Sequence, residues 1–183
     1  MKLVGLDRDG TIIKDQYYLG STEDYMNKIE LYPVSEGIKL LNKSGAKVVV
    51  ISNQSGIARE YFDCNLVEEI DGEIFNQLKQ EGAIIDGWYS CPHVDFKYAK
   101  KAKIELPGEW VVENPKCRKP NIGMLEEACD DLGLKLDDIE AYVIGDKQID
   151  VQTAKNAGGK GYLVDMENHP EEFLKICKEI IKK

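Results

Sequence analysis

Two aspartates stand two positions apart near the start of the chain. Asp7 and Asp9 follow the apolar run at residues 3–6, which has the composition of a strand buried on both faces. Crowded carboxylates repel each other, and keeping them ionised in a partly buried cleft costs free energy unless a cation neutralises them. Acidic turns after strands are common, so the pair indicates chemistry only if other segments supply complementary groups.

Three further segments carry polar or charged side chains directly after an apolar run or directly before a helical stretch. Ser52 and Asn53 follow a second apolar run, and Asp146 follows a third. Arg118 and Lys119 precede a helical stretch, where free backbone N–H groups and the helix dipole favour an anion. The carboxyl ends of strands in an open parallel sheet converge on one edge, and ligands bind there. The four segments therefore predict one site.

The residue types at this predicted edge suit phosphoryl transfer. Mg²⁺ prefers oxygen ligands and bridges protein carboxylates to a phosphate, which makes Asp7 and Asp146 candidate ligands. Lys119 and Ser52 would meet the charge on the transferring group from the other side. Asp7, held by its strand, is placed to attack phosphorus and form an acyl phosphate. Asp9 is then predicted to protonate the leaving oxygen and later to accept a proton from water.

The rest of the chain predicts the scaffold for this site. Apolar strands alternate with amphipathic helical stretches, as in a parallel sheet covered by helices on both faces. Strands are predicted at residues 3–6, 47–51, 84–89, 141–144 and 161–164. Helices are predicted at residues 35–44, 63–80 and 121–132, the last capped by Asn121, and from Pro170 onward. Two segments, 15–33 and 92–120, break the alternation and are interpreted as long loops, either functional or surface hairpins.

Composition limits the classes of protein that fit. The 183 residues, 43% of them hydrophobic, suit a single domain spanning residues 1–183. The net charge of −9 and the scattered basic residues argue against a nucleic-acid partner. No apolar run approaches the roughly 18 residues that cross a bilayer, and no basic and apolar leader precedes the first strand. The five cysteines form no regular framework, which favours reduced thiols in a cytoplasmic protein. No strongly apolar exposed helix face is evident, so a monomer is expected.

The motifs, taken in order, resemble those of the haloacid dehalogenase (HAD) superfamily of phosphatases. They are LDRDGT at residues 6–11, VVVISNQSGIARE at 48–60, CRKPNIGM at 117–124 and VIGDKQIDV at 143–151. The resemblance implies a HAD-like Rossmannoid fold, an α/β three-layer sandwich with a central, mostly parallel sheet. No insertion between the motifs is large enough for a cap domain, so an open cleft is expected.

Within the superfamily, SNQSGIAR, CRKP and the CPH at residues 91–93 are similar to the heptose bisphosphate phosphatase group, kin of the histidinol phosphatases. The resemblance implies Asp7 as nucleophile, Asp9 as general acid and base, and Mg²⁺ held by Asp7, Asp146 and the backbone carbonyl of Asp9. It also implies phosphate binding by Ser52, Asn53 and Lys119, substrate contacts by Arg118 and Lys119, and supporting roles for Lys147 and Asp150.

The implied reaction is removal of the 7-phosphate of D-glycero-D-manno-heptose 1,7-bisphosphate. Histidinol phosphate, or another small phosphomonoester, is the alternative substrate. The implied partner is thus a small phosphorylated metabolite.

A zinc site common in that group is altered here. The group carries Cys-x-His and a later Cys-x-Cys, whereas this chain has Cys91, His93 and Cys117 with Pro115 in place of a cysteine. Structural zinc normally takes four ligands. Either Asp95 or Glu113 completes the set, or the site is lost and a hairpin at residues 110–112 replaces it. The missing thiolate favours loss.

Overall fold

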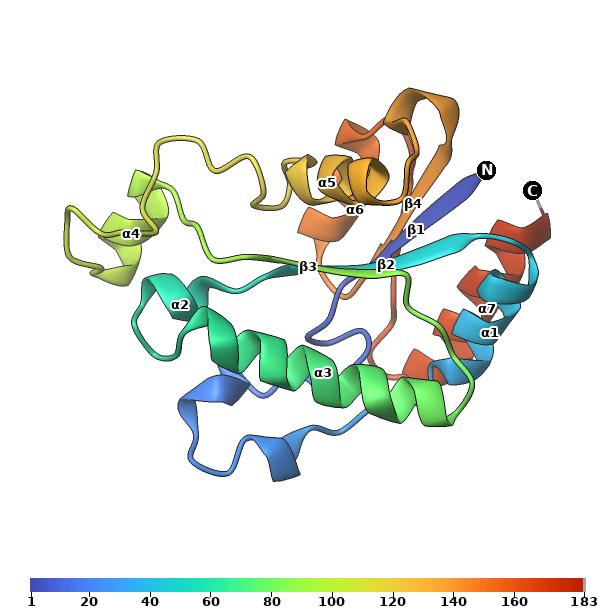
Figure 1. Ribbon diagram of the computed structural model, residues 1–183, viewed down its shortest axis with the longest axis horizontal. Coiled ribbons are helices and arrows are strands. Elements are labelled where there is room, and N and C mark those ends of the chain that lie inside the picture. Colours follow the sequence, from blue (N-terminus) through green and yellow to red (C-terminus); the bar gives the residue numbers. More distant parts are fainter. Residues whose placement is uncertain (183) are drawn as a thin grey trace.

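The computed structural model describes residues 1–182, in which the strands form one five-stranded sheet (Figure 1). They are β1 (Lys2–Leu6), β2 (Lys47–Asn53), β3 (Gly87–Cys91), β4 (Glu140–Gly145) and β5 (Lys160–Leu163). Their order is β3-β2-β1-β4-β5, and each neighbouring pair is parallel. β1 is therefore the central strand, and all the strands end at the same edge.

Helices cover both faces of the sheet (Figure 1). One face carries α1 (Ser35–Lys43), α3 (Cys64–Gln80) and α7 (His169–Lys182). The other carries α5 (Gly123–Asp131) and α6 (Gln148–Asn156). The shorter α2 (Ser55–Ala58), α4 (Phe96–Ala102) and three 3-10 turns, η1 (Leu19–Ser21), η2 (Met26–Lys28) and η3 (Leu136–Asp138), lie in the connections. The predicted three-layer α/β sandwich is confirmed.

The central strand packs into a core on each side. Val4 and Leu6 belong to the core beneath α1, α3 and α7, while Leu3 belongs to the core beneath α5 and α6. All three side chains are fully buried, and burial of each such side chain stabilises the fold by roughly 1.5–3 kcal/mol. A strand buried on both faces shows no polar alternation, which explains the continuous apolar run before Asp7.

Two predicted element starts are wrong. β3 begins at Gly87 rather than at residue 84, because Ile84 is exposed and its backbone N–H binds the side chain of Asn42 on α1. Asn121 does not cap α5, which begins at Gly123. The Asn121 amide donates instead to the Pro115 carbonyl, at 3.0 Å, and so closes the preceding turn.

The segment at residues 92–120 is not a plain loop. It contains α4, whose first turn is capped by the Asp95 carboxylate accepting from the Tyr98 backbone N–H at 2.6 Å. The hairpin predicted at residues 110–112 is also wrong. Val111 pairs with Val94 in a parallel bridge, whereas the strands of a hairpin are antiparallel. The Val94 N–H donates to the Trp110 carbonyl, and the Val94 carbonyl accepts from the Val112 N–H. The segment is thus folded against itself beside the carboxyl end of β3 (Figure 1).

The other long connection, at residues 15–33, is closed at its base and lies beside α3. Ile13 and Leu31 form an antiparallel bridge where it begins and ends. The Tyr25 hydroxyl donates to the Glu69 carboxylate of α3 at 2.7 Å. None of the described helices is long and apolar enough to span a membrane.

His169 begins α7 in an almost fully buried position. It is 1% exposed and stacks on Tyr32 with 3.7 Å between ring centroids. Burial lowers the pKa of His169 below its usual value, because the charged imidazolium is poorly solvated there. The unfolded chain therefore binds a proton in a pH range where the folded chain does not.

We expect this histidine to make the fold acid-sensitive. Its contribution to stability is fully present above the unfolded pKa of about 6.5 and is lost as the pH falls from there toward the lower folded pKa. The urea midpoint should therefore decrease between pH 7.5 and pH 5.5, and by less in His169→Phe, which keeps a planar ring but cannot ionise. An equal decrease in both proteins would contradict the assignment.

Candidate active site

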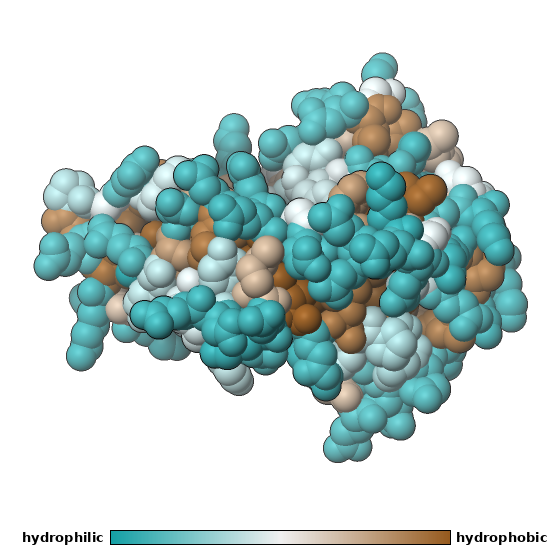
Figure 2. All heavy atoms as spheres, turned by 60° about the horizontal axis from the view of Figure 1, so that its bottom comes forward, coloured by the Kyte–Doolittle hydropathy of each residue, from teal (hydrophilic) through white to brown (hydrophobic). Residues whose placement is uncertain are grey.

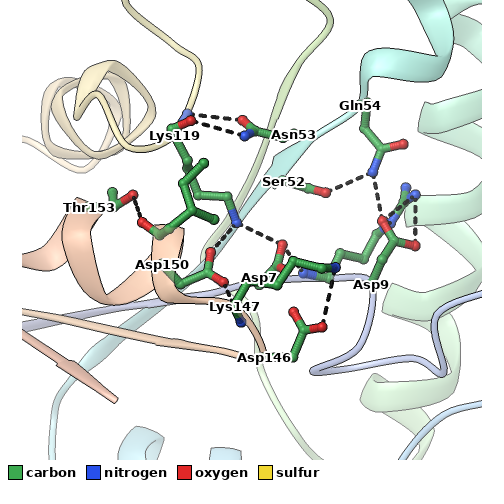
Figure 3. A network of polar contacts seen from close by, with 12 residues as sticks. Asp7, Asp9, Ser52, Asn53, Gln54, Lys119, Asp146, Lys147, Asp150 and Thr153 are labelled. Atoms are coloured by element: carbon green, nitrogen blue, oxygen red, sulfur yellow. Dashed lines mark hydrogen bonds and ion pairs between the residues drawn. The ribbon is translucent and has the colours of Figure 1, made fainter. Parts of the chain in front are cut away.

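The predicted site residues converge at the carboxyl edge of the sheet (Figure 3). Asp7 follows β1, Ser52 and Asn53 end β2, and Asp146 follows β4. The turn before α5 brings Lys119 into the same place, where its ammonium contacts Asp7 Oδ1 at 2.8 Å. Residues 112 positions apart are thus in direct contact, as the parallel-sheet argument predicted.

Lys119 is buried between two carboxylates. Its second partner is Asp150 Oδ1 on α6, at 2.6 Å, and Asp150 is fully buried. Burial alone would lower the pKa of Lys119, but the charges of Asp7 and Asp150 outweigh it and raise that pKa. Lys119 therefore stays charged in the interior. Only a supporting role was predicted for Asp150, whereas the structure makes it the second carboxylate partner of the buried Lys119.

Asp7 is strongly perturbed by its surroundings. Desolvation raises its pKa to about 7, opposed by Lys119 and reinforced by the charge of Asp150. The residue is 6% exposed. A nucleophilic carboxylate must be ionised, so a second cation beside Asp7 would favour its reactive form.

The carboxylates around Asp7 fit a divalent cation. Asp7, Asp146 and Asp150 each place one oxygen so that all three lie within 4.8 Å of one another. The Asp146 Oδ1 atom is buried and has no hydrogen-bond partner within residues 1–182, while Oδ2 lies 3.2 Å from the Lys147 ammonium. A buried carboxylate oxygen without a donor suits an all-oxygen Mg²⁺ site. The side chain of Asp9 is not in this cluster, and the predicted contribution of its backbone carbonyl stays a prediction.

Asn53 fixes the turn that carries Lys119. Its side-chain oxygen accepts from the Lys119 backbone N–H at 3.0 Å, and its amide nitrogen donates to the Lys119 carbonyl at 3.2 Å. The reciprocal pair joins this turn to the end of β2 (Figure 3). A phosphate contact by Asn53 stays a prediction.

Asp9 lies on the other side of the site and is held by donors that the sequence analysis missed. Arg8 forms an ion pair with its Oδ2 at 3.0 Å, and Gln54 donates to the same oxygen at 2.8 Å. Gln54 also donates to Ser52 Oγ at 2.7 Å, and Arg8 is anchored at 2.9 Å by Asp71 of α3. The Asp9 side chain remains 25% exposed. No sequence spacing predicts the contact between Arg8 and Asp71. Gln54 could have been predicted as a site residue, because it follows Ser52 and Asn53 in the second motif.

Comparison with known proteins agrees with this geometry. The polynucleotide kinase 3 phosphatase family matches residues 2–157. A relative from Mesorhizobium japonicum, named D-glycero-beta-D-manno-heptose-1,7-bisphosphate 7-phosphatase, is 36% identical over 163 residues, covering 88% of this chain and 69% of the relative. The protein of the same name from Haemophilus ducreyi is 34% identical, covering 87% of this chain and 80% of that one. The chain belongs to the heptose bisphosphate phosphatase family of HAD-like phosphatases.

Solved structures of HAD-like phosphatases share the fold. A candidate HAD-like phosphatase from Mesorhizobium loti superimposes with a TM-score of 0.75 and 29% identity, covering 96% of this chain and 87% of that one. The D,D-heptose 1,7-bisphosphate phosphatase from B. bronchiseptica, solved with magnesium and phosphate, gives a TM-score of 0.74 at 24% identity over 100% of this chain and 99% of that one. The two matches cover 96% and 100% of this HAD-like chain.

A cleft of about 240 Å³ lies beside Asp9 in this HAD-like phosphatase. Asp9 and Asn53 line it on the sheet side, and Tyr18, Ser55 and Lys147 are also in its wall. Arg118, predicted to contact substrate, lies beside α4 rather than among the ion pairs of Lys119. It donates to the His93 carbonyl at 3.2 Å, and its guanidinium lies 4.7 Å from the centre of the Tyr98 ring.

The cysteine cluster of this family member departs from expectation. Cys91 and Cys117 form a disulfide, so the prediction that all five thiols are reduced is wrong for these two. The bond forms because the end of β3 and the turn before Arg118 are adjacent. His93 Nδ1 lies 3.4 Å from Cys117 Sγ, and the three ligand atoms lie within 4.8 Å of one another, so the reduced cluster could hold a zinc ion. Neither Asp95 nor Glu113 belongs to it, and Asp95 is engaged as the cap of α4.

Proposed function

We propose that this protein is a Mg²⁺-dependent phosphatase that removes the 7-phosphate of D-glycero-D-manno-heptose 1,7-bisphosphate. The observation that carries the chemistry is the buried Lys119 between Asp7 and Asp150, with the unpartnered Asp146 oxygen beside them. The names of the relatives from M. japonicum and H. ducreyi support the substrate. Histidinol phosphate or another small phosphomonoester is the alternative.

In the proposed mechanism the Asp7 carboxylate attacks phosphorus. A bond forms between Asp7 and the phosphoryl group as the bond from phosphorus to the sugar oxygen breaks, giving an aspartyl phosphate and an alcohol. Lys119 and Ser52 bind the equatorial oxygens of the transferring group. Bound Mg²⁺, held by Asp7, Asp146 and the Asp9 backbone carbonyl, would supply further positive charge there.

Asp9 moves the protons in both halves of the proposed reaction. In the first it donates a proton to the leaving sugar oxygen, which leaves as the alcohol. In the second it accepts a proton from the water that attacks the aspartyl phosphate, releasing inorganic phosphate and restoring Asp7. Its carboxylate is held in place for both steps by the ion pair with Arg8 at 3.0 Å and by the Gln54 amide at 2.8 Å.

Replacement of Asp9 by asparagine should slow turnover by about 10²–10⁴-fold, the range typical of a lost general acid or base. The amide keeps the size of the side chain and can still bond to Gln54, so the fold should be unchanged. Steady-state phosphate release measures the effect. Asp24→Asn, an exposed carboxylate in the 15–33 loop, is the matched control. A loss below tenfold would assign the proton transfers to another group.

A substrate panel tests the proposed function. It contains the two anomers of the heptose bisphosphate, fructose 1,6-bisphosphate, histidinol phosphate, a nucleoside monophosphate and a 3′-phosphorylated oligonucleotide, each with Mg²⁺ and with EDTA. We expect a preference of about 100-fold in kcat/KM for a heptose bisphosphate, or about 2.7 kcal/mol of transition-state discrimination. Turnover that survives chelation would overturn the Mg²⁺ role. Equal, slow turnover of the whole panel would overturn the heptose substrate and leave the phosphatase chemistry standing.

We further propose a single-domain, monomeric, cytoplasmic enzyme without a nucleic-acid partner. The single sheet supports one domain, and the net charge of −9 opposes nucleic-acid binding. Figure 2 shows mostly hydrophilic side chains over the face it presents, with hydrophobic ones in scattered groups, which supports a monomer. The free Cys64, Cys129 and Cys177 suit a reducing compartment, in which the Cys91–Cys117 disulfide would be reduced to two thiols.

A further inference from the structure

A buried carboxylate on α3, that of Asp71, lies outside the four motifs. Asp71 follows the buried Ile70, and its side chain is only 12% exposed. Burial raises the pKa of Asp71, and the charge of Arg8 opposes that rise. A carboxylate in such a position costs free energy unless it is paired. Its partner therefore indicates what Asp71 does.

Asp71 binds one end of the Arg8 guanidinium, and Asp9 binds the rest of it. Asp71 Oδ1 accepts from Arg8 Nη1 at 2.9 Å, and Arg8 is 2% exposed. On the other side, Arg8 Nη2 and Nε lie 3.0 Å and 3.2 Å from Asp9 Oδ2, and Nη2 lies 3.3 Å from Asp9 Oδ1. One planar group thus connects α3 to both carboxylate oxygens of Asp9.

The helix supplies a fixed reference for this connection. Arg8 and Asp9 are neighbours in one turn, so a contact between them does not by itself fix their position relative to the sheet. α3 has 17 residues and packs along one face of the sheet through Ile70, Ile74 and Leu78 (Figure 1). Because Asp71 ties the guanidinium to this helix, the fork geometry of arginine then fixes the plane of the Asp9 carboxylate.

Asp71 itself is set back from the cleft. Among residues 1–182, Arg8 and Asp9 line the cleft and Asp71 does not. Figure 3 shows Asp9 on the opposite side of the site from Lys119. A general acid must meet the leaving oxygen within a narrow range of distance and angle, and a misplacement of about 1 Å can cost on the order of 10²-fold in rate. Asp71 can therefore affect the reaction only through Arg8.

We propose that Asp71 is a positioning residue for the proton transfers, and that it acts through Arg8 to hold the Asp9 carboxylate where it reaches the leaving oxygen. The inference rests on the proposed function in assigning these transfers to Asp9. It adds a residue of α3 to the geometry of the reaction, so that the ion pair between Arg8 and Asp71 serves catalysis as well as the fold.

Two substrates with different leaving groups test the inference, both with Mg²⁺ present. D-glycero-D-manno-heptose 1,7-bisphosphate releases an alcohol, whose oxygen needs a proton, whereas p-nitrophenyl phosphate releases a stable phenolate that can leave without one. The value of kcat/KM covers the steps up to formation of the aspartyl phosphate and loss of the leaving group. The ratio of the two kcat/KM values, sugar to aryl, therefore reports how well Asp9 donates its proton.

Asp71→Leu removes the acceptor for Arg8 and keeps a similar side-chain volume. The ratio should fall by about tenfold, less than the roughly 10²–10⁴-fold of a lost general acid, because Asp9 is displaced rather than removed. Asp71→Asn keeps an acceptor oxygen and should recover most of the loss. The double variant Arg8→Met/Asp71→Leu replaces the buried pair by apolar side chains, a change that is often neutral for stability. Its ratio should equal that of Arg8→Met alone, since Asp71 acts through Arg8.

Asp86→Leu is the matched control, because the Asp86 side chain is 14% exposed and pairs with Lys47 at 2.7 Å, at the opposite edge of the sheet. It should leave the ratio at the wild-type value. An unchanged ratio in Asp71→Leu, whether or not both rates decrease, would mean that Asp71 only neutralises Arg8 and would overturn the inference. Wild type that hydrolyses neither substrate, or only the aryl phosphate, would instead overturn the proposed function, and with it the proton transfers that Asp71 is inferred to serve.

Discussion

An Asp7→Asn variant is expected to lose phosphatase activity by roughly 10⁴-fold or more, the scale reported when a nucleophile that acts as part of a unit is removed. The amide cannot form the acyl phosphate, and no other carboxylate ends β1. Asp150 is not a substitute nucleophile, because it is fully buried and engaged by Lys119 and by the Lys147 backbone N–H. Phosphate release under single-turnover conditions measures the loss.

The fold should tolerate this change. Lys119 keeps its partner Asp150 at 2.6 Å, and the substitution removes a carboxylate whose pKa burial raises to about 7. A carboxyl with a raised folded pKa weakens the fold above its unfolded pKa of about 3.9. The free energy of unfolding at pH 8 should therefore be no lower in Asp7→Asn than in wild type. Retention of more than a trace of turnover by a folded variant would rule out Asp7 as nucleophile.

Much of the site could be predicted because a few rules connect sequence to position. Leu3, Val4 and Leu6 form an apolar run because β1 is buried on both faces, and the end of a buried parallel strand is where ligands bind. The same rule placed Ser52 and Asp146 beside Asp7. Lys119 needed a second rule, since its position depends on a turn rather than a strand; it was predicted from its place just before a helix amino terminus, which favours an anion.

The features that escaped prediction depend on contacts between distant segments. Arg8 pairs with Asp71 across 63 positions, and Cys91 bonds to Cys117 across 26. Neither pair has a spacing that distinguishes it from other residues of the same type. α4 is only seven residues long, so its helical periodicity is weak, and its stability comes from the Asp95 cap and from burial of Ala99 against Val94. The contacts of the Tyr98 hydroxyl with Ser55 and Arg59 could not be inferred without that helix.

A Lys119→Met variant is expected to be both inactive and strongly destabilised. Methionine fills a similar volume, but it leaves Asp7 and Asp150 as buried carboxylates without their cation. Removing one partner of a buried ion pair typically costs about 3–5 kcal/mol. Urea unfolding at pH 8, followed by circular dichroism, should show a decrease in the free energy of unfolding of this size, with phosphate release abolished in the fraction that remains folded.

The pH dependence distinguishes an uncompensated charge from a packing defect. Without Lys119 the two carboxyls take up protons more readily in the folded than in the unfolded chain, so the stability deficit relative to wild type should shrink as the pH falls from 8 to 5.5. Lys147→Met is the matched control, because Lys147 is half-exposed and pairs with Asp15 and Asp146 near the surface. Its loss should cost no more than about 1 kcal/mol. A deficit in Lys119→Met that is independent of pH would mean that Lys119 stabilises the fold by packing rather than by neutralising Asp7 and Asp150.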